Sequence, residues 1–242
     1  MNISELHLAL RDLPGQSAFY TEILGLPLIE ATPSRLAVQA GTTRLVFEAD
    51  SGAGGVYHFA FNIPENKLGG ARRWLAERTP LLTREGEDEF DSDLWNAHMV
   101  YFRDADGNIL EFIARHDLES GTAGPFGPHG VLGVSEIGFP VQDVPEGVEW
   151  LRQALALETY REASDTFTPL GDEQGLFIVV PVGRPWFPTH DRASALPLKV
   201  VIAGGWEGTL TVPGLPYLIC GEGGHEAGRE NASSDVRAGQ QN

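Results

Sequence analysis

The segment His98-Met-Val-Tyr-Phe-Arg-Asp-Ala-Asp-Gly-Asn-Ile-Leu-Glu-Phe-Ile-Ala-Arg115 predicts a β-hairpin and carries the first sign of a functional site. Strand-forming residues stand on both sides of a cluster of turn formers at 104–108. Asp and Asn side chains close local hydrogen bonds there, and Gly107 tolerates the positive φ of a tight turn. Glu111 is the one charge in the apolar run Ile109 to Ala114. Because burying a carboxylate alone costs several kcal/mol, a partner is expected for it.

Composition excludes several classes of function. The chain has 242 residues and a formal net charge of −17, with no Lys/Arg-rich run, which argues against nucleic acid and anionic membranes as partners. No apolar run approaches the ~20 residues that span a bilayer, and the N-terminus lacks a signal pattern, so we expect a cytoplasmic protein. The single Cys220 excludes an internal disulfide framework.

The first half of the chain reads as two successive β-α-β-β units. In the first, a strand over 3–10 precedes a helix start at Asp12-Leu-Pro14, and strands over 35–40 and 43–49 follow. In the second, a strand over 56–63 and a helix opening at Pro64 precede the hairpin described above.

An internal repeat indicates that this module was duplicated. Ile3 to Leu10 aligns with Val134 to Val141 at an offset of 131, and the same offset pairs Leu45 to Glu48 with Leu176 to Val179. A fourth, eroded module is expected from strands over 198–203 and 209–220. The predicted organisation is a metal-binding domain over 1–117, a linker over 118–131, a degenerate domain over 132–220 and a disordered tail over 221–242.

Strand alternation separates an apolar face from a polar one in the first two modules. Residues of one parity are large and apolar and are expected beneath the helices. The opposite face is too polar for a second core and predicts the lining of a ligand cavity: Glu5, His7, Arg35, Gln39, Arg44, Glu48, His58, Asn62, Met99, Tyr101, Arg103, Glu111 and Arg115.

Two histidines and one glutamate on this face suggest a metal site. His7 and His58 occupy corresponding positions in the first strands of modules one and two, and Glu111 lies in the last strand of module two. Two imidazoles and a carboxylate are the minimum ligand set for a divalent first-row metal. In the third module Gly138 stands at the position of His7, and Val179 at that of Glu48, so the fold does not need these ligands.

These motifs carry a family resemblance. Leu-His-Leu-Ala-Leu at 6–10, Tyr-His-Phe-Ala-Phe at 57–61 and Tyr-Phe-Arg-Asp-Ala-Asp-Gly-Asn-Ile-Leu-Glu at 101–111 resemble the vicinal oxygen chelate superfamily. That superfamily includes glyoxalase I, type I extradiol dioxygenases, fosfomycin-resistance transferases and bleomycin-resistance proteins. The resemblance covers 1–116 and, at module level, 132–220. It implies an α+β fold of tandem βαββ modules whose curved mixed sheets surround a metal-binding cavity.

The resemblance leaves the reaction open. Two His and one Glu match the iron site of extradiol dioxygenases, so a ring-cleaving dioxygenase is favoured, with Fe(II) or Mn(II) ahead of Ni(II) or Zn(II). Glyoxalase I-like isomerisation is second. Glyoxalase I has a fourth metal ligand, which is a Glu, and the corresponding position here is Val46; Glu48 lies one pleat further along the same face of the strand. A fosfomycin-type thiol transferase is third, and a non-enzymatic binder like the bleomycin-resistance proteins is the rival class.

Roles for the remaining polar residues follow from the same comparison. Tyr101 matches a substrate-contacting Tyr, Glu48 would be a fourth ligand or a general base, and His98 would assist proton transfer or serve as a loop-end hydrogen-bonding residue. Residues expected to contact substrate are Arg35, Arg44, Met99, Arg103 and Arg115. The partner is expected to be a small molecule, and the second half could form a homodimer surface.

Overall fold

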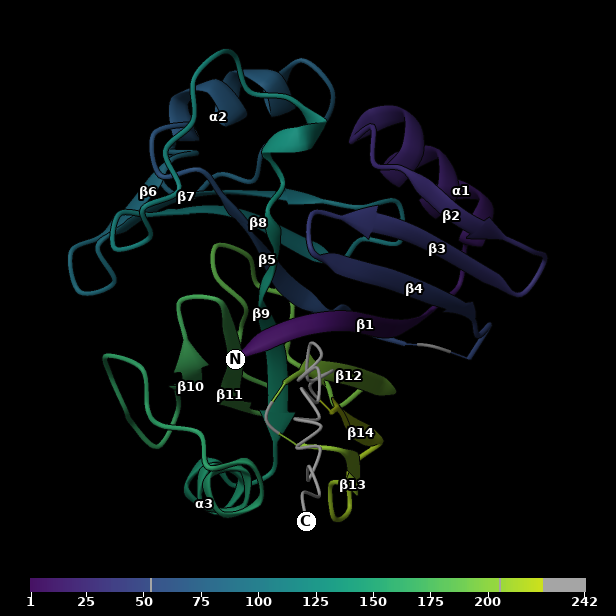
Figure 1. Ribbon diagram of the computed structural model, residues 1–242, viewed down its shortest axis with the longest axis vertical. Helices are drawn as coiled ribbons and strands as arrows, with labels where there is room; N and C mark the ends of the chain where they lie inside the picture. The colour runs from purple at the N-terminus through teal and green to yellow at the C-terminus, as the bar shows by residue number, and fades with distance from the viewer. Residues whose placement is uncertain (53, 205, 224–242) are drawn as a thin grey trace, which may run out of the picture.

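Two curved seven-stranded mixed sheets form the protein. The computed structural model describes residues 1–52, 54–204 and 206–223 (Figure 1). The β1 sheet runs in the order β13 (Gly208–Thr211), β14 (Tyr217–Glu222), β12 (Leu198–Ala203), β1 (Asn2–Leu10), β4 (Thr43–Ala49), β3 (Arg35–Ala40) and β2 (Leu28–Ala31). The β5 sheet runs in the order β10 (Thr168–Asp172), β11 (Gly175–Pro181), β9 (Gly133–Val141), β5 (His58–Ile63), β8 (Ile109–Arg115), β7 (Ala97–Arg103) and β6 (Phe90–Ser92).

Helices follow the first strand of the first three modules, as the sequence predicts. They are α1 (Leu13–Ala18) continued by the π-helical η1 (Phe19–Ile23), α2 (Leu68–Ala76) and α3 (Val144–Leu155), with a short 3-10 turn η2 (Pro128–Gly130). The predicted helix start at Asp12 is confirmed, because its side chain accepts from the Gly15 amide at 3.0 Å. Asp143 caps α3 in the same way and accepts from the Glu146 amide at 2.9 Å. In the fourth module, residues 204–207 alone separate β12 from β13, which agrees with an eroded unit.

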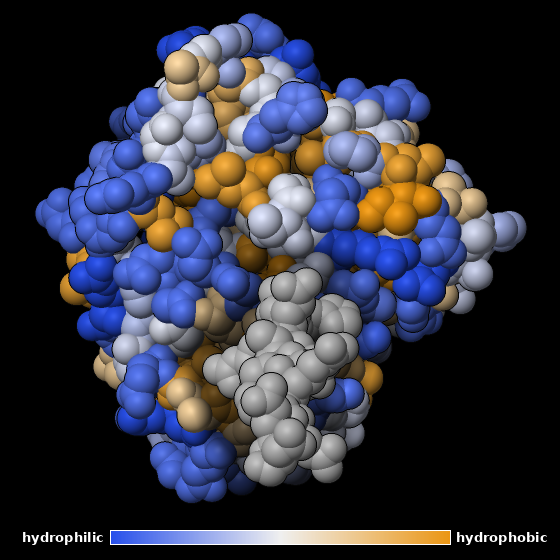
Figure 2. All heavy atoms as spheres, viewed as in Figure 1, coloured by the Kyte–Doolittle hydropathy of each residue, from blue (hydrophilic) through white to orange (hydrophobic). Residues whose placement is uncertain are grey.

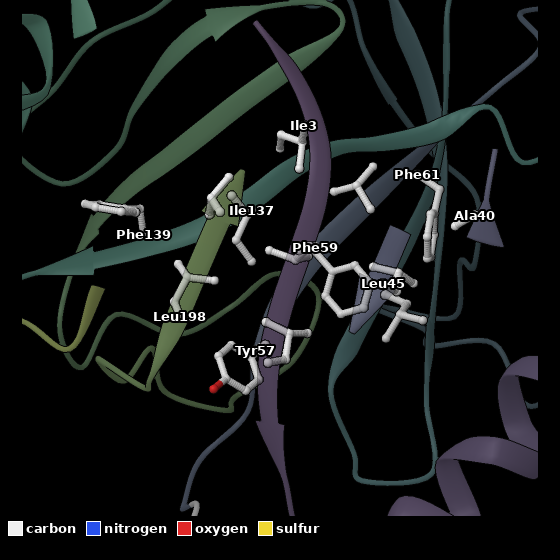
Figure 3. Close-up of a cluster of buried hydrophobic side chains, with 14 of the residues drawn as sticks. Ile3, Ala40, Leu45, Tyr57, Phe59, Phe61, Ile137, Phe139 and Leu198 are labelled. Carbon is white, nitrogen blue, oxygen red and sulfur yellow. The ribbon is translucent and has the colours of Figure 1, made fainter. Parts of the chain in front are cut away.

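The larger of two apolar clusters joins the two sheets. It includes all the residues that alternation places beneath the helices, so Leu6 and Leu8 of β1 share the cluster with Phe59 and Phe61 of β5. Figure 3 shows side chains from both sheets converging there. Because this core takes one face of both sheets, their other faces point away from each other. On the β5 sheet that other face carries the second cluster, which includes Met99, Ile113 and Ile178, so the prediction that it is too polar for a second core is wrong for this sheet.

The sheets do not follow the predicted division into two halves of the chain. β1 pairs antiparallel with β12 of the fourth module, and β5 pairs antiparallel with β9 of the third. Each sheet therefore combines one module from 1–117 with one from 132–220. The connection expected over 118–131 packs on α2, where Phe126 lies 5.6 Å from the Trp74 ring. Of the expected tail, 221–222 end β14 and 224–242 lie outside the described residues.

The gapless repeat alignment slips by one residue in β11. Leu6 pairs with Leu45 in the first module, but the matching Ile137 pairs with Phe177, not with Leu176. The counterpart of Glu48 is therefore Val180, and the assignment to Val179 is corrected. A slip of one residue moves a side chain to the other face of a strand, which is why Val179 lies in the main core.

The hairpin turn is confirmed and also anchors α1. Gly107 has a φ of +88°, and the buried Asp104 carboxylate accepts from the amides of Asp106 at 3.0 Å and Asn108 at 2.9 Å. The same carboxylate receives Gln16 Nε2 at 2.8 Å and the Tyr20 hydroxyl at 3.2 Å. This residue of the hairpin motif thus ties module one to module two.

We expect Asp104→Asn to lower the free energy of unfolding by about 2 kcal/mol, because an amide NH₂ would face donors that now meet an oxygen. Urea denaturation checks this value. Asp106→Asn is the control, since its side chain bonds mainly to the Arg11 backbone at the surface; equal losses in both variants would contradict an anchoring role for Asp104.

Figure 2 shows a face dominated by hydrophilic residues, with smaller apolar areas between them. Among the described residues, none of the helices combines the length and apolar character needed to cross a bilayer.

Candidate metal and substrate site

His58 presents a free ring nitrogen on the polar face of the β5 sheet. The alternation that sends Phe59 and Phe61 into the core turns His58 the other way. Its Nδ1 lies 3.1 Å from the Ile109 carbonyl oxygen, which can only accept, so Nδ1 carries the proton and Nε2 keeps its lone pair. Burial lowers the pKa of His58 to about 4, so the ring is neutral near pH 7.

Glu111 and Tyr101 face His58 from the two strands of the hairpin. They are opposite each other in the β7–β8 register, so the Tyr101 and Glu111 side chains lie side by side. Glu111 Oε2 lies 3.7 Å from His58 Nε2. Burial, and then the nearby Glu136 carboxylate, raise the pKa of Glu111. Burial and the Glu111 charge raise the pKa of Tyr101, so its hydroxyl stays protonated.

Glu136 completes the cluster from the second half of the chain. Glu111 and Glu136 both pair with Ala60, from β8 on one side of β5 and from β9 on the other. The small Ala60 side chain leaves room for the two carboxylates to approach each other. As a result, one ligand atom each of His58, Glu111 and Glu136 lies within 4.8 Å of the others.

Arg115 partly neutralises the negative charge of these two carboxylates. Its guanidinium bonds to Glu136 Oε1, and its Nε donates to Asn62 Oδ1 at 3.2 Å. The side chain is 1% exposed and packs against the rings of Trp95 and Tyr160. Burial raises the pKa of Glu136, and the Arg115 charge opposes that rise.

A cavity of about 180 Å³ opens beside the cluster and has aromatic walls. Residues 182–193, called the strap below, follow β11 and cover it with Trp186 and Phe187. The Trp186 ring lies 5.0 Å from the His58 ring. It also occupies the space above Gly138, where an added Cβ would lie 2.7 Å from Trp186 Cη2. The position that matches His7 in the third module is therefore filled by an indole ring.

The structure brings part of the predicted site together. His58, Glu111, Tyr101 and Met99 line the cavity, and Arg115 lies beneath it. Arg103 lies at its edge, where it bonds to Asp191 of the strap.

His7 is not brought to His58 and Glu111, which corrects the expectation of one site built from all three. His7 lies in the β1 sheet, and its Nε2 is 2.8 Å from Glu5 Oε2, with Glu48 3.9 Å from Nδ1. Arg35 and Arg44 also belong to the β1 sheet and pair with Glu30. The physical reason is that the sheets share a core through their apolar faces, so their polar faces form two separate surfaces.

His98 is also absent from the cavity wall. It is exposed on the other face of β7, with Nδ1 2.7 Å from Nε2 of His116. This placement agrees with the alternative of a hydrogen-bonding residue at the strand edge and not with assistance to proton transfer.

Sequence reasoning missed Glu136, Trp186 and Arg184. Glu136 had a signal, since the offset of 131 aligns Ser135-Glu136 with Ser4-Glu5, and it is the one charge in β9. The two strap residues lie in an irregular segment without periodic pattern.

Burial of neutral His58 makes stability depend on pH. Its pKa is lower in the folded state than the unperturbed 6.5, so on acidification the unfolded chain gains this proton first and stability falls from about pH 6.5 down to about pH 4. For this residue alone the loss between about pH 7 and about pH 5 is about 2 kcal/mol. Urea denaturation gives the free energy of unfolding of wild type and of His58→Gln as a function of pH, and the difference between the two curves measures this loss. Parallel curves would contradict this burial of a neutral ring.

Comparison with solved structures identifies the fold. A protein of Bacillus subtilis subsp. subtilis str. 168 named a "putative dioxygenase" matches with a TM-score of 0.61 at 17% identity, covering 91% of this chain and 85% of that one. Glyoxalase I from Zea mays matches with a TM-score of 0.53 at 16% identity, covering 83% and 74%. A mutant of the maize enzyme matches with a TM-score of 0.55 at 14% identity, covering 91% and 93%.

No protein-family model and no curated protein matches the sequence. At these identities the likeness concerns the fold, and it agrees with the βαββ modules described above. Dioxygenases and glyoxalase I are two kinds of protein that the superfamily includes, so the resemblance carried by the hairpin and histidine motifs is confirmed: this chain has the fold of the vicinal oxygen chelate superfamily.

Proposed function

We propose that the protein is a metal-dependent enzyme that binds a small molecule with two adjacent oxygens in the cavity of the β5 sheet. The observation that supports this proposal is the convergence of His58 Nε2 with the carboxylates of Glu111 and Glu136, buried and within 4.8 Å of one another.

The donor set fits a divalent cation. First-row ions bind nitrogen and oxygen at about 2.0–2.2 Å, so neighbouring ligands need to lie about 3 Å apart. His58 and Glu111 approach that spacing at 3.7 Å without a hydrogen bond between them. Arg115 bonds to Oε1 of Glu136, which leaves Oε2 for an ion. A set with two carboxylates suits Mn(II) or Fe(II).

The arrangement favours proton transfer, as in glyoxalase-type isomerisation. A bound divalent ion would act there as a Lewis acid on the substrate oxygens. Glu111, whose pKa burial raises well above its usual value, lines the cavity and would accept a proton from the substrate and return it. Tyr101 keeps its proton and can donate a hydrogen bond to a substrate oxygen. Trp186 and Phe187 provide apolar walls beside these groups.

Ring cleavage by dioxygen is the second candidate. Its support is the fold likeness to the Bacillus subtilis protein, at a TM-score of 0.61. The sequence favours ring cleavage because two imidazoles are expected at one ion. His7 lies in the other sheet, so only His58 supplies an imidazole to this site. A facial set of two His and one carboxylate is the usual iron site of such oxygenases.

The experiment combines metal analysis with two assays on the full chain. Purified protein is analysed for bound metal, titrated with Mn(II), Fe(II), Ni(II) and Zn(II), and then tested for isomerisation of a thiol hemithioacetal and for oxygen uptake with catechols. Glu111→Gln should lose at least about a hundredfold in whichever activity is present, because a positioned base contributes about 10²–10⁴-fold. A protein that binds none of these ions would be a non-enzymatic binder, and the proposal would be dropped.

A further inference from the structure

Arg184 is a cavity cation without a carboxylate partner among the described residues. Its guanidinium lines the cavity from the strap and lies 5.1 Å from the centre of the Phe167 ring. Within the described residues it makes no ion pair, and its hydrogen bond to the Pro185 carbonyl is long at 3.5 Å. An Arg side chain has five N–H donors, so most of the donors of this half-buried side chain are open to the cavity or to solvent. The neighbouring Arg103 and Arg115 are both bonded to carboxylates.

The carboxylates near Arg184 are already engaged. Glu136 is bonded to Arg115, and Glu162 receives Trp95 Nε1 at 2.8 Å. Glu162 is the anion that acts most directly on Arg184, yet the two are not within ion-pair distance. With a divalent ion bound at His58, the formal charges around the cavity sum to +1. The ion contributes +2, the two arginines (Arg115 and Arg184) contribute +1 each, and the three carboxylates (Glu111, Glu136 and Glu162) contribute −1 each.

The walls of the cavity favour a flat ligand. Trp186, Tyr101 and Phe187 present ring faces or edges to it, and Phe187 lies 5.5 Å from Tyr101. At about 180 Å³ the cavity is smaller than the roughly 300–1,000 Å³ typical of sites for drug-sized ligands. It therefore suits a molecule the size of one substituted ring.

We propose that the substrate of this cavity is a small planar carboxylic acid, aromatic or conjugated, whose carboxylate pairs with Arg184. The guanidinium fork matches a carboxylate in geometry, and the partly desolvated strap strengthens that pair. The aromatic side chains hold the plane of the molecule, and its further oxygens reach His58 and Glu111. This inference deepens the proposed function and rests on it for the charge of the ion.

The test compares two probes that differ in one charge, 3,4-dihydroxybenzoate and its uncharged amide. Each is titrated calorimetrically into the full chain, with and without Mn(II). We expect the acid to bind at least about tenfold more tightly than the amide to wild type with Mn(II). Arg184→Gln should remove this preference by weakening the acid alone, and Arg184→Lys should retain part of it. Arg192→Gln is the matched control, because Arg192 lies in the same strap, is outside the cavity and bonds to the Gly183 carbonyl at 2.7 Å.

Each result decides between the two proposals. Equal affinities for acid and amide, binding of neither, or a preference that survives in Arg184→Gln would overturn the carboxylate inference, whether or not Mn(II) binds. A preference that depends on Arg184 in a protein that binds no Mn(II) would support carboxylate binding and overturn the metal-dependent function. Thermal melts verify that the Arg184 variants fold. If Arg184→Gln does not fold, Arg184→Lys decides. A full preference for the acid in Arg184→Lys would overturn the role of the guanidinium fork.

Discussion

His58→Ala is expected to lower the affinity for Mn(II) by about a hundredfold or more, whereas His7→Ala leaves it unchanged. Loss of residues that only orient metal ligands costs about 10–100-fold, so removal of a direct ligand should cost at least as much. His58 Nε2 faces Glu111 at 3.7 Å, but His7 lies in the β1 sheet with its ring bonded to Glu5. Calorimetric titration of the purified variants gives both affinities.

The two histidines are a matched pair for this purpose. Each occupies the same position in its module and the same polar face of its strand, so the comparison separates placement in the fold from residue type. A loss in His7→Ala equal to that in His58→Ala would contradict the placement of the two rings on separate surfaces. Glu136→Gln should weaken Mn(II) as well, and this result would support a ligand contributed by β9.

Strand alternation predicted which face of each strand is buried but not which strands share a sheet. Leu6 and Phe59 lie in one core as expected, because alternation is a local property of the backbone. The pairing of β1 with β12 and of β5 with β9 joins segments far apart in the sequence. The periodicity within a strand does not carry that information. The sequence therefore predicts one cavity where the structure has two separate faces, one on the β1 sheet and one on the β5 sheet.

The same distinction explains the site. His58, Glu111 and Tyr101 were predictable because they belong to one module, in which the hairpin register puts Tyr101 opposite Glu111. Glu136 enters only through the neighbouring β9, from a module that lacks the His and whose sequence predicts no metal ligand. Trp186 explains the missing His, since its ring fills the space above Gly138.

Arg115→Met is expected to lower the free energy of unfolding by about 3–5 kcal/mol near pH 8, the usual cost of leaving a buried charge unpaired. Arg115 is the one cation bonded to Glu136, and it also opposes the rise in the pKa of Glu111. Both carboxyls have a higher pKa in the folded state than in the unfolded one. Stability is therefore lost as pH rises from the unfolded pKa, about 4.3, through the folded values. Without Arg115 those values rise further, so the loss should be larger at about pH 8 than at about pH 5.

Urea denaturation at the two pH values measures this difference. Arg72→Met is the control, because the partly exposed Arg72 side chain pairs with Asp88 at 2.6 Å. This substitution should cost less than about 1 kcal/mol at either pH. Mn(II) should restore part of the stability of Arg115→Met, since a cation at Glu136 would replace the missing positive charge. A variant as stable as wild type at both pH values would contradict the view that Arg115 is what allows two carboxylates to be buried side by side.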